Sequence, residues 1–338
     1  MHLPGWTLLE ALTHHDPGGR GLPAYRVAGA PLDAGNLRRA AEDLAARAVA
    51  VAIVTGFCVE TDTGVTAETD GPPGALFLAR ALRHCGVEVA LVGDRYVTPL
   101  LTAGCRRWGL PAECLHEMPL ELPTAKAAAW TQGFLDGPFG RQLTHLLAIE
   151  RCGPSHTLAS MTAQRRAGPP PVEEFERTVP PGDRDVYHNM RGLPLDAHTA
   201  KTHLLLEQAA SRQPRITTIG IGDGGNELGM GSFPWETVAR AVGTSPAPRI
   251  VCRIAADLPL LAGVSNWAGY ALGLAVCQLR LGSVPPTWTA EVLRLLLETL
   301  VQAGAVDGVT RRPEATVDGL PLEEYLRHFA AIRAAVVG

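Results

Sequence analysis

Two carboxylates and an amide follow directly after an apolar run in residues 216–231, ITTIGIGDGGNELGMG. The run 216–221 is short, largely β-branched and bounded by glycine, which is typical of a buried strand. Asp223, Asn226 and Glu227 then lie in a glycine-rich loop, and glycine lets a backbone approach a ligand closely. This loop could therefore direct several backbone N–H groups and two acids at one point.

Several interpretations of this loop compete. The spacing Gly220-x-Gly222-x-x-Gly225 matches a dinucleotide fingerprint, but Asp223 would then face the pyrophosphate, and the acid expected about 20 residues later is missing. A P-loop is excluded because no Gly-Lys-Ser/Thr follows. Asp223 and Glu227, at positions i and i+4, could instead hold a hard cation or act as acid and base. A tight turn whose acids only cap a helix is the remaining interpretation.

Length, charge and composition limit the class of protein. The chain has 338 residues and a net charge of −4 without a basic stripe, so nucleic acid is not an expected partner. Lysine occurs only at Lys126 and Lys201, which weakens the case for Schiff-base chemistry. The seven cysteines have no C-x-x-C spacing, which favours a reducing, cytoplasmic location without a zinc site. The N-terminus lacks the basic and apolar regions of a signal peptide.

Residues 258–279 contain no charged side chain and are long enough to span a bilayer. Pro259, Ser265, Asn266 and several glycines interrupt the segment, and polar side chains are costly in lipid. We therefore expect a buried core helix and no membrane association.

Apolar strands alternate with helices along the chain, which indicates an α/β fold whose mostly parallel sheet is flanked by helices in Rossmann-like layers. Strands are expected at residues 49–57, 87–94, 112–118, 143–150, 216–221 and 249–257. Helices are expected at residues 36–48, 73–85, 99–108, 124–135, 155–166, 199–212, 234–242, 263–281, 289–303 and 322–336. A single domain, 1–338, would include a loop-rich N-terminal segment (1–35), a polar loop (60–74) and a Pro-rich insertion (168–182).

Several of these strands end at an acid or run into an acidic loop. The acids are Glu60, Asp70, Asp94, Glu150, Asp223 and Asp257. The carboxyl ends of parallel strands share one edge of a sheet, and ligands bind in the crevice outside that edge. We therefore expect a cluster of carboxylates, and the active site, at this edge. Because crowded carboxylates raise one another's pKa unless a cation neutralises them, the cluster favours a Mg²⁺ or Mn²⁺ site.

Two segments that begin helices could contribute to this crevice. Asp70 and Gly71 precede the Pro-Pro start of a helix, where Asp70 could bind a metal and the backbone at Gly71 could approach the substrate. Ser265 and Asn266 begin a very apolar helix and could face the same crevice. The alternative for both segments is that the polar side chains only cap the helices.

Asn189 and Arg191, in the segment NMRG, offer an amide and a guanidinium suited to binding a carboxylate. A surface turn with a structural arginine is the alternative. The neighbouring His188 is isolated, and no Ser-His-Asp or Cys-His arrangement can be assembled from the spacings.

Taken together, these segments resemble the D-glutamate cyclase C-terminal-like family. The resemblance rests on TDGPPGA at 69–75, Glu150-Arg151-x-Gly153, NMRG at 189–192, IGDGGNELGMG at 219–231, AGVSNWAGYAL at 262–272 and VDGL at 317–320. It implies an α/β fold, dependence on a divalent metal such as Mn²⁺ or Mg²⁺, and formation of 5-oxo-D-proline from D-glutamate. In larger members this domain follows a second, N-terminal domain.

The resemblance implies a reaction in which the α-amine of D-glutamate attacks its own γ-carboxylate and water is released. The metal ligands expected for it are Asp70, Glu150, Asp223 and Glu227. The expected catalytic groups are Asp223, Glu227 as the base, and the N–H groups of Gly224 and Gly225, which would stabilise an oxyanion. The expected substrate contacts are Asp70, Gly71, Asn189, Arg191, Asn226, Ser265 and Asn266.

Two other functions fit the same residues. A divalent-metal-dependent phosphoesterase could use the same carboxylates, with arginine and helix N-termini binding the phosphate. A non-catalytic metabolite-binding protein is the second alternative. In each case the expected partner is a small molecule, and a homo-oligomer is compatible with the sequence.

Overall fold

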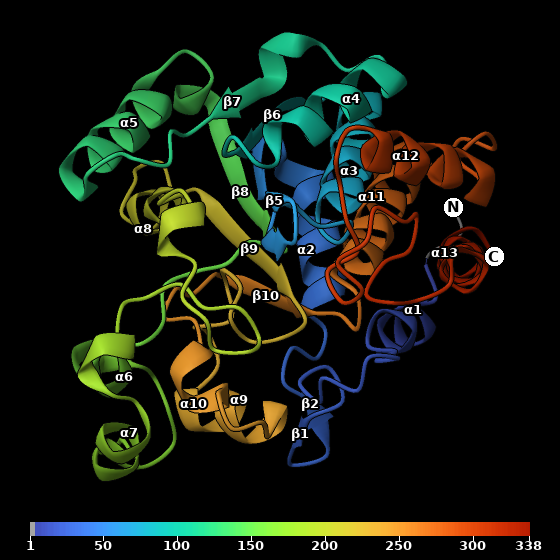
Figure 1. Cartoon of the computed structure of the whole chain (residues 1–338). Coiled ribbons are helices and arrows are strands. Elements are labelled where there is room, and N and C mark those ends of the chain that lie inside the picture. The colour runs from blue at the N-terminus through green and yellow to red at the C-terminus, as the bar shows by residue number, and fades with distance from the viewer. Residues whose placement is uncertain (1–3) are drawn as a thin grey trace.

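A six-stranded sheet forms the centre of the computed structural model, which describes residues 4–338 (Figure 1). The strands are β3 (Ala50–Thr55), β6 (Glu88–Gly93), β7 (Leu115–Glu117), β8 (Leu143–Ile149), β9 (Thr217–Gly222) and β10 (Leu258–Leu261). Their order is β10-β9-β8-β3-β6-β7, and every neighbouring pair is parallel. The prediction of a parallel, Rossmann-like α/β fold is therefore confirmed. Because the order reverses between β3 and β8, a ligand crevice is expected at the carboxyl ends of these two strands.

Helices cover both faces of the sheet (Figure 1). One face carries α2 (Asn36–Arg47), α3 (Pro72–His84), α4 (Thr98–Trp108) and α11 (Ser265–Leu281), joined by α1 (Trp6–Thr13), α12 (Ala290–Gln302) and α13 (Leu322–Val337). The other face carries α5 (Thr124–Asp136) and α8 (His203–Ala210). A separate group contains α6 (Leu158–Ala163), α7 (Val172–Thr178), α9 (Trp235–Val242) and α10 (Ala247–Ile250). Residues 4–338 also contain four short 3-10 helices: Ala112–Cys114, Gly140–Gln142, Pro181–Asp183 and Asp196–His198.

The alternation of side chains along β3 separates two hydrophobic cores. Val51 and Ile53 belong to the core that contains α3 and α11. Ala52 and Val54 point to the opposite face and belong to the core that contains α5 and α8. The strand is therefore buried on both sides, as expected for a central parallel strand.

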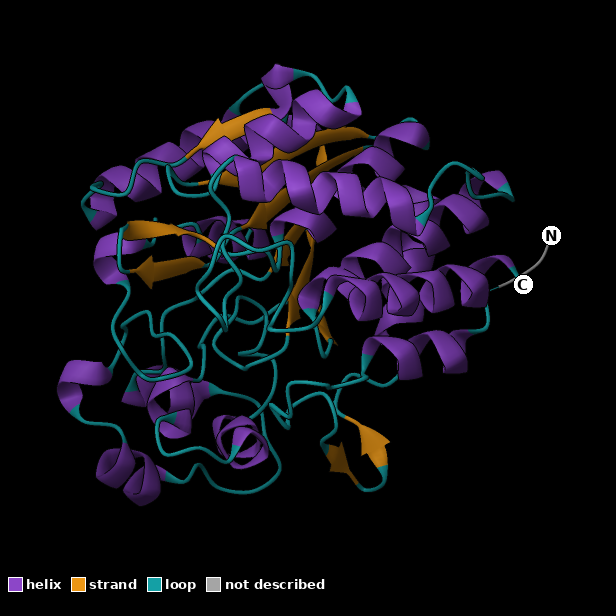
Figure 2. Cartoon of the chain, turned by 45° about the vertical axis from the view of Figure 1, so that its right-hand side comes forward, coloured by secondary structure: helices purple, strands orange, loops and turns teal. Residues whose placement is uncertain are grey.

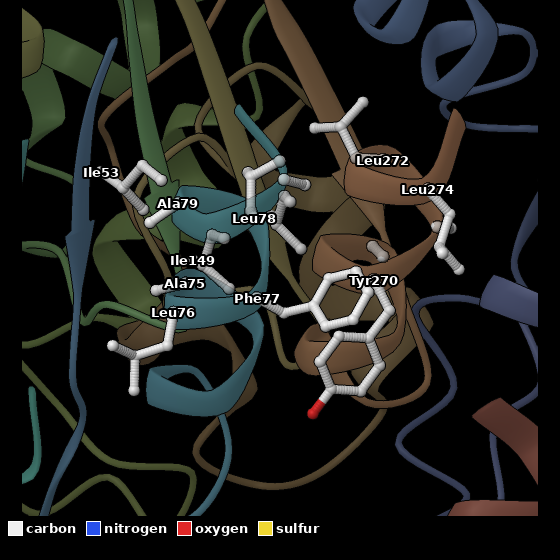
Figure 3. Packing of buried hydrophobic residues seen from close by; sticks show 14 of the residues in the cluster. Ile53, Ala75, Leu76, Phe77, Leu78, Ala79, Ile149, Tyr270, Leu272 and Leu274 are labelled. Atoms are coloured by element: carbon white, nitrogen blue, oxygen red, sulfur yellow. The ribbon is translucent and has the colours of Figure 1, made fainter. Parts of the chain in front are cut away.

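Helices α3 and α11 pack closely against each other. Phe77 of α3 meets Tyr270 of α11 edge to face, with their ring centroids 5.1 Å apart (Figure 3). A Cβ atom added to Gly269 of α11 would lie 3.1 Å from the Cα atom of Gly74 in α3, so the backbones approach directly. This pairing holds the N-termini of both helices together beside the end of β8, where a Cβ atom added to Gly71 would meet Glu150.

Some of the predicted elements are wrong. Residues 251–257 form only isolated bridges, such as Ser155 with Cys252, and the edge strand is β10 just after them. The buried helix expected within residues 258–279 therefore begins only at Ser265. Residues 60–74 are not simply a loop, because β4 (Cys58–Thr61) and β5 (Gly64–Ala67) form a hairpin there. The predicted N-terminal loop contains α1 and the ribbon of β1 (Arg26–Val27) and β2 (Ala30–Pro31), and the Pro-rich insertion contains α7.

Among the helices of residues 4–338, none is both long enough and apolar enough to cross a membrane. Helix α11 is buried along its length from Ser265 to Gln278, and it packs against α2, α3 and α13. Its apolar composition is explained by this packing.

Candidate active site

The loops that follow the strands gather in one region of the molecule (Figure 2). A cavity of about 250 Å³ lies there. Glu150 follows β8 and Asp223 follows β9, and the two strands are paired with Ile149 opposite Ile221. Both acids line the cavity, as do Arg20, Glu68, Asn189, Arg191, Asn226 and Arg311.

Asp70 and Asn266 cap each other's helix. The Asp70 carboxylate accepts hydrogen bonds from the backbone N–H groups of Ser265 (2.8 Å) and Asn266 (2.9 Å) at the start of α11. The side-chain oxygen of Asn266 accepts from the N–H groups of Gly71 (3.1 Å) and Gly74 (2.6 Å) at the start of α3. The capping interpretation therefore describes both side chains, and the N–H group of Gly71 is not free for the predicted substrate contact. A carboxylate has about four lone-pair sites, so Asp70 retains acceptor capacity for a ligand.

Glu227 is held by its own loop. Its two carboxylate oxygens accept hydrogen bonds from the N–H groups of Gly224 and Gly225, each at 2.8 Å. The prediction that these two N–H groups support an oxyanion is therefore corrected, because both already donate to a carboxylate. Burial raises the pKa of Glu227, although the hydrogen bonds from the loop oppose that shift.

Glu150 has a φ of +44°, a left-handed conformation that is unusual for a residue other than glycine. Its carboxylate accepts a hydrogen bond of 2.6 Å from the hydroxyl of Ser265. Burial, followed by the charges of Glu227 and Asp70, raises the pKa of Glu150 well above its ordinary value. Backbone strain of this kind is concentrated at functional sites, and Glu150 therefore becomes a candidate for proton transfer.

Arg20 lies among the acids of the cavity. Its guanidinium forms ion pairs with Asp223 and with Asp318, the latter at 2.7 Å. The carboxylate of Asp16 fixes this loop by accepting hydrogen bonds from the N–H groups of Arg20 (3.1 Å) and Gly21 (2.8 Å). Burial alone would lower the pKa of Arg20, but the surrounding carboxylates, led by that of Asp318, raise it.

Two groups of acids could hold a cation. Oxygen atoms of Asp70, Asp223 and Asp318 lie within 4.8 Å of one another, and so do oxygen atoms of Glu150, Asp223 and Glu227. Asp223 belongs to both groups. Burial raises the pKa of the other four carboxyl groups, and a divalent cation would oppose that shift. A set of hard oxygen donors suits Mg²⁺ or Mn²⁺ better than softer metals.

The predicted substrate contacts from the other loops differ in whether their polar atoms are available to bind a ligand. Asn226 is fully buried; its Nδ2 donates to the carbonyl of His188 at 2.8 Å, whereas its Oδ1 has no partner among residues 4–338. The Oδ1 atom of Asn189 accepts the N–H groups of Arg191 (2.9 Å) and Leu193 (3.1 Å), so it shapes a turn. The Arg191 side chain is exposed where it lines the cavity. Asn226 and Arg191 thus retain polar atoms for a ligand.

Comparison with known proteins places the chain in a family. The sequence model described as D-glutamate cyclase-like, C-terminal, matches residues 9–167 and 175–333. The chain belongs to the D-glutamate cyclase-like family. The human protein named "D-glutamate cyclase, mitochondrial" is 30% identical over 347 residues, which cover 93% of this chain and 48% of that relative. The chain therefore spans about half the length of the curated relative it matches.

The resemblance seen in the sequence is thus confirmed, and the relative is named as an enzyme. The two matched segments of the D-glutamate cyclase-like chain leave out residues 168–174, within the predicted Pro-rich insertion. The name of the human relative places that protein in mitochondria, and the cytoplasmic location of this chain stays a prediction.

Three of the strand-end acids lie outside the cluster of this D-glutamate cyclase-like chain. Glu60 is exposed within β4, where its carboxylate lies 3.5 Å from His198. Asp94 forms a buried ion pair with Arg151 at 2.6 Å. Asp257 precedes β10 instead of ending a strand, so it lies at the amino-terminal ends of the strands. There its carboxylate accepts a hydrogen bond from the N–H group of Thr218 at 2.9 Å. The prediction that the strand-end acids would form one cluster is therefore wrong for these three residues.

The D-glutamate cyclase-like fold also brings residues to the site that sequence reasoning did not select. They are Arg20, Glu68, Asp318 and Arg311. Glu68 and Asp318 lie within or beside segments that carry the family resemblance, so their position was a usable signal. Arg20 and Arg311 lie in turns with no local pattern, and only the tertiary fold shows where they are.

Gly229 anchors the acid-bearing loop to β9. Its φ is +105°, and a Cβ atom added there would lie 2.5 Å from the Cα atom of Gly220 in the strand. Gly229→Ala is expected to lower the free energy of unfolding by about 3 kcal/mol, because both the backbone angle and the contact become strained. Urea unfolding of the two proteins would measure the loss.

Gly133→Ala is the matched control for this prediction. Gly133 lies inside α5, and nothing lies within 4 Å of a Cβ atom added there. This change is expected to leave the free energy of unfolding unchanged or raise it by about 0.5–1 kcal/mol. Equal stability of the two variants would contradict the proposed role of Gly229.

Proposed function

We propose that this chain converts D-glutamate to 5-oxo-D-proline with loss of water, as a lyase that uses a bound Mn²⁺ or Mg²⁺ ion. The observation that carries the proposal is the coincidence of family membership with a cavity lined by buried acids. The name of the human relative supplies the substrate, and a cavity of about 250 Å³ suits a molecule of this size.

The acids at the carboxyl edge fit a divalent cation. The proposed ligands are Asp223, which belongs to both acid groups, together with Asp70 and Asp318 or with Glu150 and Glu227. All of these donors are hard carboxylate oxygens, as Mg²⁺ and Mn²⁺ prefer. When bound, such a cation supplies a Lewis acid that makes the γ-carboxylate more electrophilic.

Glu150 is the base that the geometry favours. It lines the cavity, and the hydroxyl of Ser265 donates to one of its carboxylate oxygens, which leaves the other oxygen to accept a proton from the substrate. Glu227, predicted earlier for this role, uses both oxygens to accept N–H groups of its own loop. As the C–N bond forms and the C–O bond breaks, the two protons given up by the substrate ammonium leave with the departing oxygen as water.

Polar groups around the cavity match the rest of the substrate. The unpartnered Oδ1 of Asn226 can accept a hydrogen bond from the substrate ammonium. The guanidinium groups of Arg191 and Arg311 line the same cavity and can bind the α-carboxylate. Holding both ends of the flexible substrate would bring the amine close to the γ-carbon, which is where proximity contributes most to an intramolecular reaction.

Proton NMR tests the proposal directly. The metal-loaded protein is incubated separately with D-glutamate, L-glutamate and each enantiomer of 5-oxoproline, and Mn²⁺ is chelated before each spectrum. Lactam is expected from D-glutamate, and 5-oxo-D-proline is expected to approach the same equilibrium mixture. The same protein treated with EDTA before incubation is the control and is expected to produce no lactam.

The same samples separate the alternatives. No lactam in any tube, with Mn²⁺ shown to be bound, would contradict the cyclase proposal. Release of phosphate from a phosphomonoester would then support the phosphoesterase, because the acid cluster serves both reactions. Thermal stabilisation by D-glutamate without turnover would support a metabolite-binding protein.

A further inference from the structure

Arg20 lies among the acids of the cavity and has no role in the proposed reaction. Its guanidinium pairs with Asp223 and Asp318. Asp223 is also the acid shared by both groups that could hold a metal. The arginine therefore occupies a carboxylate that either metal site requires.

The acids around Arg20 outnumber the cations paired with them. Within residues 4–338, Arg20 is the only basic side chain that forms an ion pair with any of Glu68, Asp70, Glu150, Asp223, Glu227 and Asp318. One guanidinium can balance only one of these six acids when they are ionised. The set therefore favours the entry of further positive charge.

A neutral acceptor gives a second, independent indication of a ligand. Asn226 is fully buried and lines the cavity, and its Oδ1 atom has no hydrogen-bond partner among the described residues. Leaving a buried acceptor unpaired is unfavourable. A bound cation or N–H donor would supply the missing partner.

We propose that Arg20 is a resident counter-cation that a divalent metal ion must displace from Asp223. The inference rests on the metal site of the proposed function, and not on the lactam chemistry. A guanidinium and a divalent ion repel each other strongly when they share one carboxylate. The apparent affinity for the metal is therefore the intrinsic affinity multiplied by the fraction of molecules in which Asp223 is free of Arg20.

The loop that carries Arg20 permits this movement. Gly19 has a φ of +63°, and nothing lies within 4 Å of a Cβ atom added there, so the turn before Arg20 has open space beside it. Asp16 holds the backbone N–H groups of Arg20 and Gly21, so the side chain of Arg20 could rotate away from Asp223 while its backbone stays in place.

The proposal is tested without any substrate by titrating the protein with Mn²⁺ alone. Calorimetry and the EPR signal of free Mn²⁺ measure the affinity for the ion. Arg20→Gln is expected to bind Mn²⁺ at least about tenfold more tightly than the unaltered chain, because the competing state is removed. Arg20→Lys keeps the charge but loses the bidentate guanidinium. Its affinity for Mn²⁺ is expected to lie between those of Arg20→Gln and the unaltered chain. Circular dichroism checks that each variant folds. If Arg20→Gln does not fold without metal, the affinity of Arg20→Lys is compared with that of the unaltered chain instead.

Arg311→Gln is the matched control. It makes the same change in the same cavity, but Arg311 forms no ion pair with the six acids. A gain in affinity of about twofold or less is expected from the loss of one screened charge. The proposal is overturned if Arg20→Gln binds no more tightly than the unaltered chain, or gains no more than Arg311→Gln.

The test also separates this inference from the proposed function. If no variant binds Mn²⁺, the exchange and the metal dependence both fail. If Mn²⁺ binds and the Arg20 variants behave as expected, the exchange stands even when D-glutamate is not converted.

Discussion

Replacing Asp223 by asparagine is expected to abolish Mn²⁺ binding and to slow lactam formation by at least about a thousandfold, since a Lewis-acid metal supplies several kcal/mol of transition-state stabilisation. Asp223 is the acid common to both groups that could hold the ion, so neither group can be completed without its charge. Asparagine keeps the size of the side chain and still accepts hydrogen bonds. Calorimetry with Mn²⁺ and the NMR rate on D-glutamate would measure the two effects on one sample.

Asp257→Asn is the control for this change. It makes the same acid-to-amide replacement at the amino-terminal ends of the strands, away from the cavity. There Asp257 accepts hydrogen bonds from the N–H group and the hydroxyl of Thr218. An asparagine can still accept these bonds, so activity within about twofold of the unaltered chain is expected. Full activity and metal binding in Asp223→Asn would refute the scheme.

Asn266→Ala is expected to lower the free energy of unfolding by about 2–5 kcal/mol, because it leaves buried backbone groups without partners. The Asn266 oxygen accepts the N–H group of Gly74, and its Nδ2 donates to the carbonyl of Thr69 at 2.9 Å. Both partners lie at the buried start of α3, where water cannot replace the lost bonds. Urea unfolding followed by fluorescence would measure the change in midpoint at constant slope.

A second amide provides the comparison. Asn189 also accepts two backbone N–H groups, but its turn is only partly buried. Water can satisfy those groups in Asn189→Ala, so a loss of about 1 kcal/mol or less is expected. If both alanine variants lost the same stability, burial would not explain the importance of the α3–α11 caps.

The sequence predicted the central strands well because each is a buried apolar run closed by glycine or an acid. Strand β10 was missed because LPLL continues into residues 262–264, AGV, without a polar break before α11 begins at Ser265. Pro259, which argues against a central strand, is tolerated because β10 lies at the edge of the sheet. Residues 251–257 have the composition of a strand, but they pair through isolated bridges with loop residues such as Gly229.

The candidate site was predictable where it depends on strand ends and not where it depends on distant loops. Asp223 and Glu150 follow from the shared edge of parallel strands. The pairing of Arg20 with Asp318 joins residues near opposite ends of the chain, and no local periodicity can indicate it. The roles of Gly224 and Gly225 were mistaken for a related reason, because the sequence cannot show that a nearby glutamate already takes their N–H groups.

The strand order of this sheet is the one that, in dinucleotide-binding proteins, presents bare helix N-termini to a phosphate. Here Asp70 covers the start of α11 and Asn266 covers the start of α3, and further acids fill the space beyond. Both helix N-termini are thereby already occupied, so an anion in this crevice would be bound by arginine side chains such as Arg191 and Arg311 instead of by a helix N-terminus. If the proposed divalent cation binds, it would balance the neighbouring acids, and we expect an anionic substrate to bind more tightly to the metal-loaded protein than to the metal-free protein.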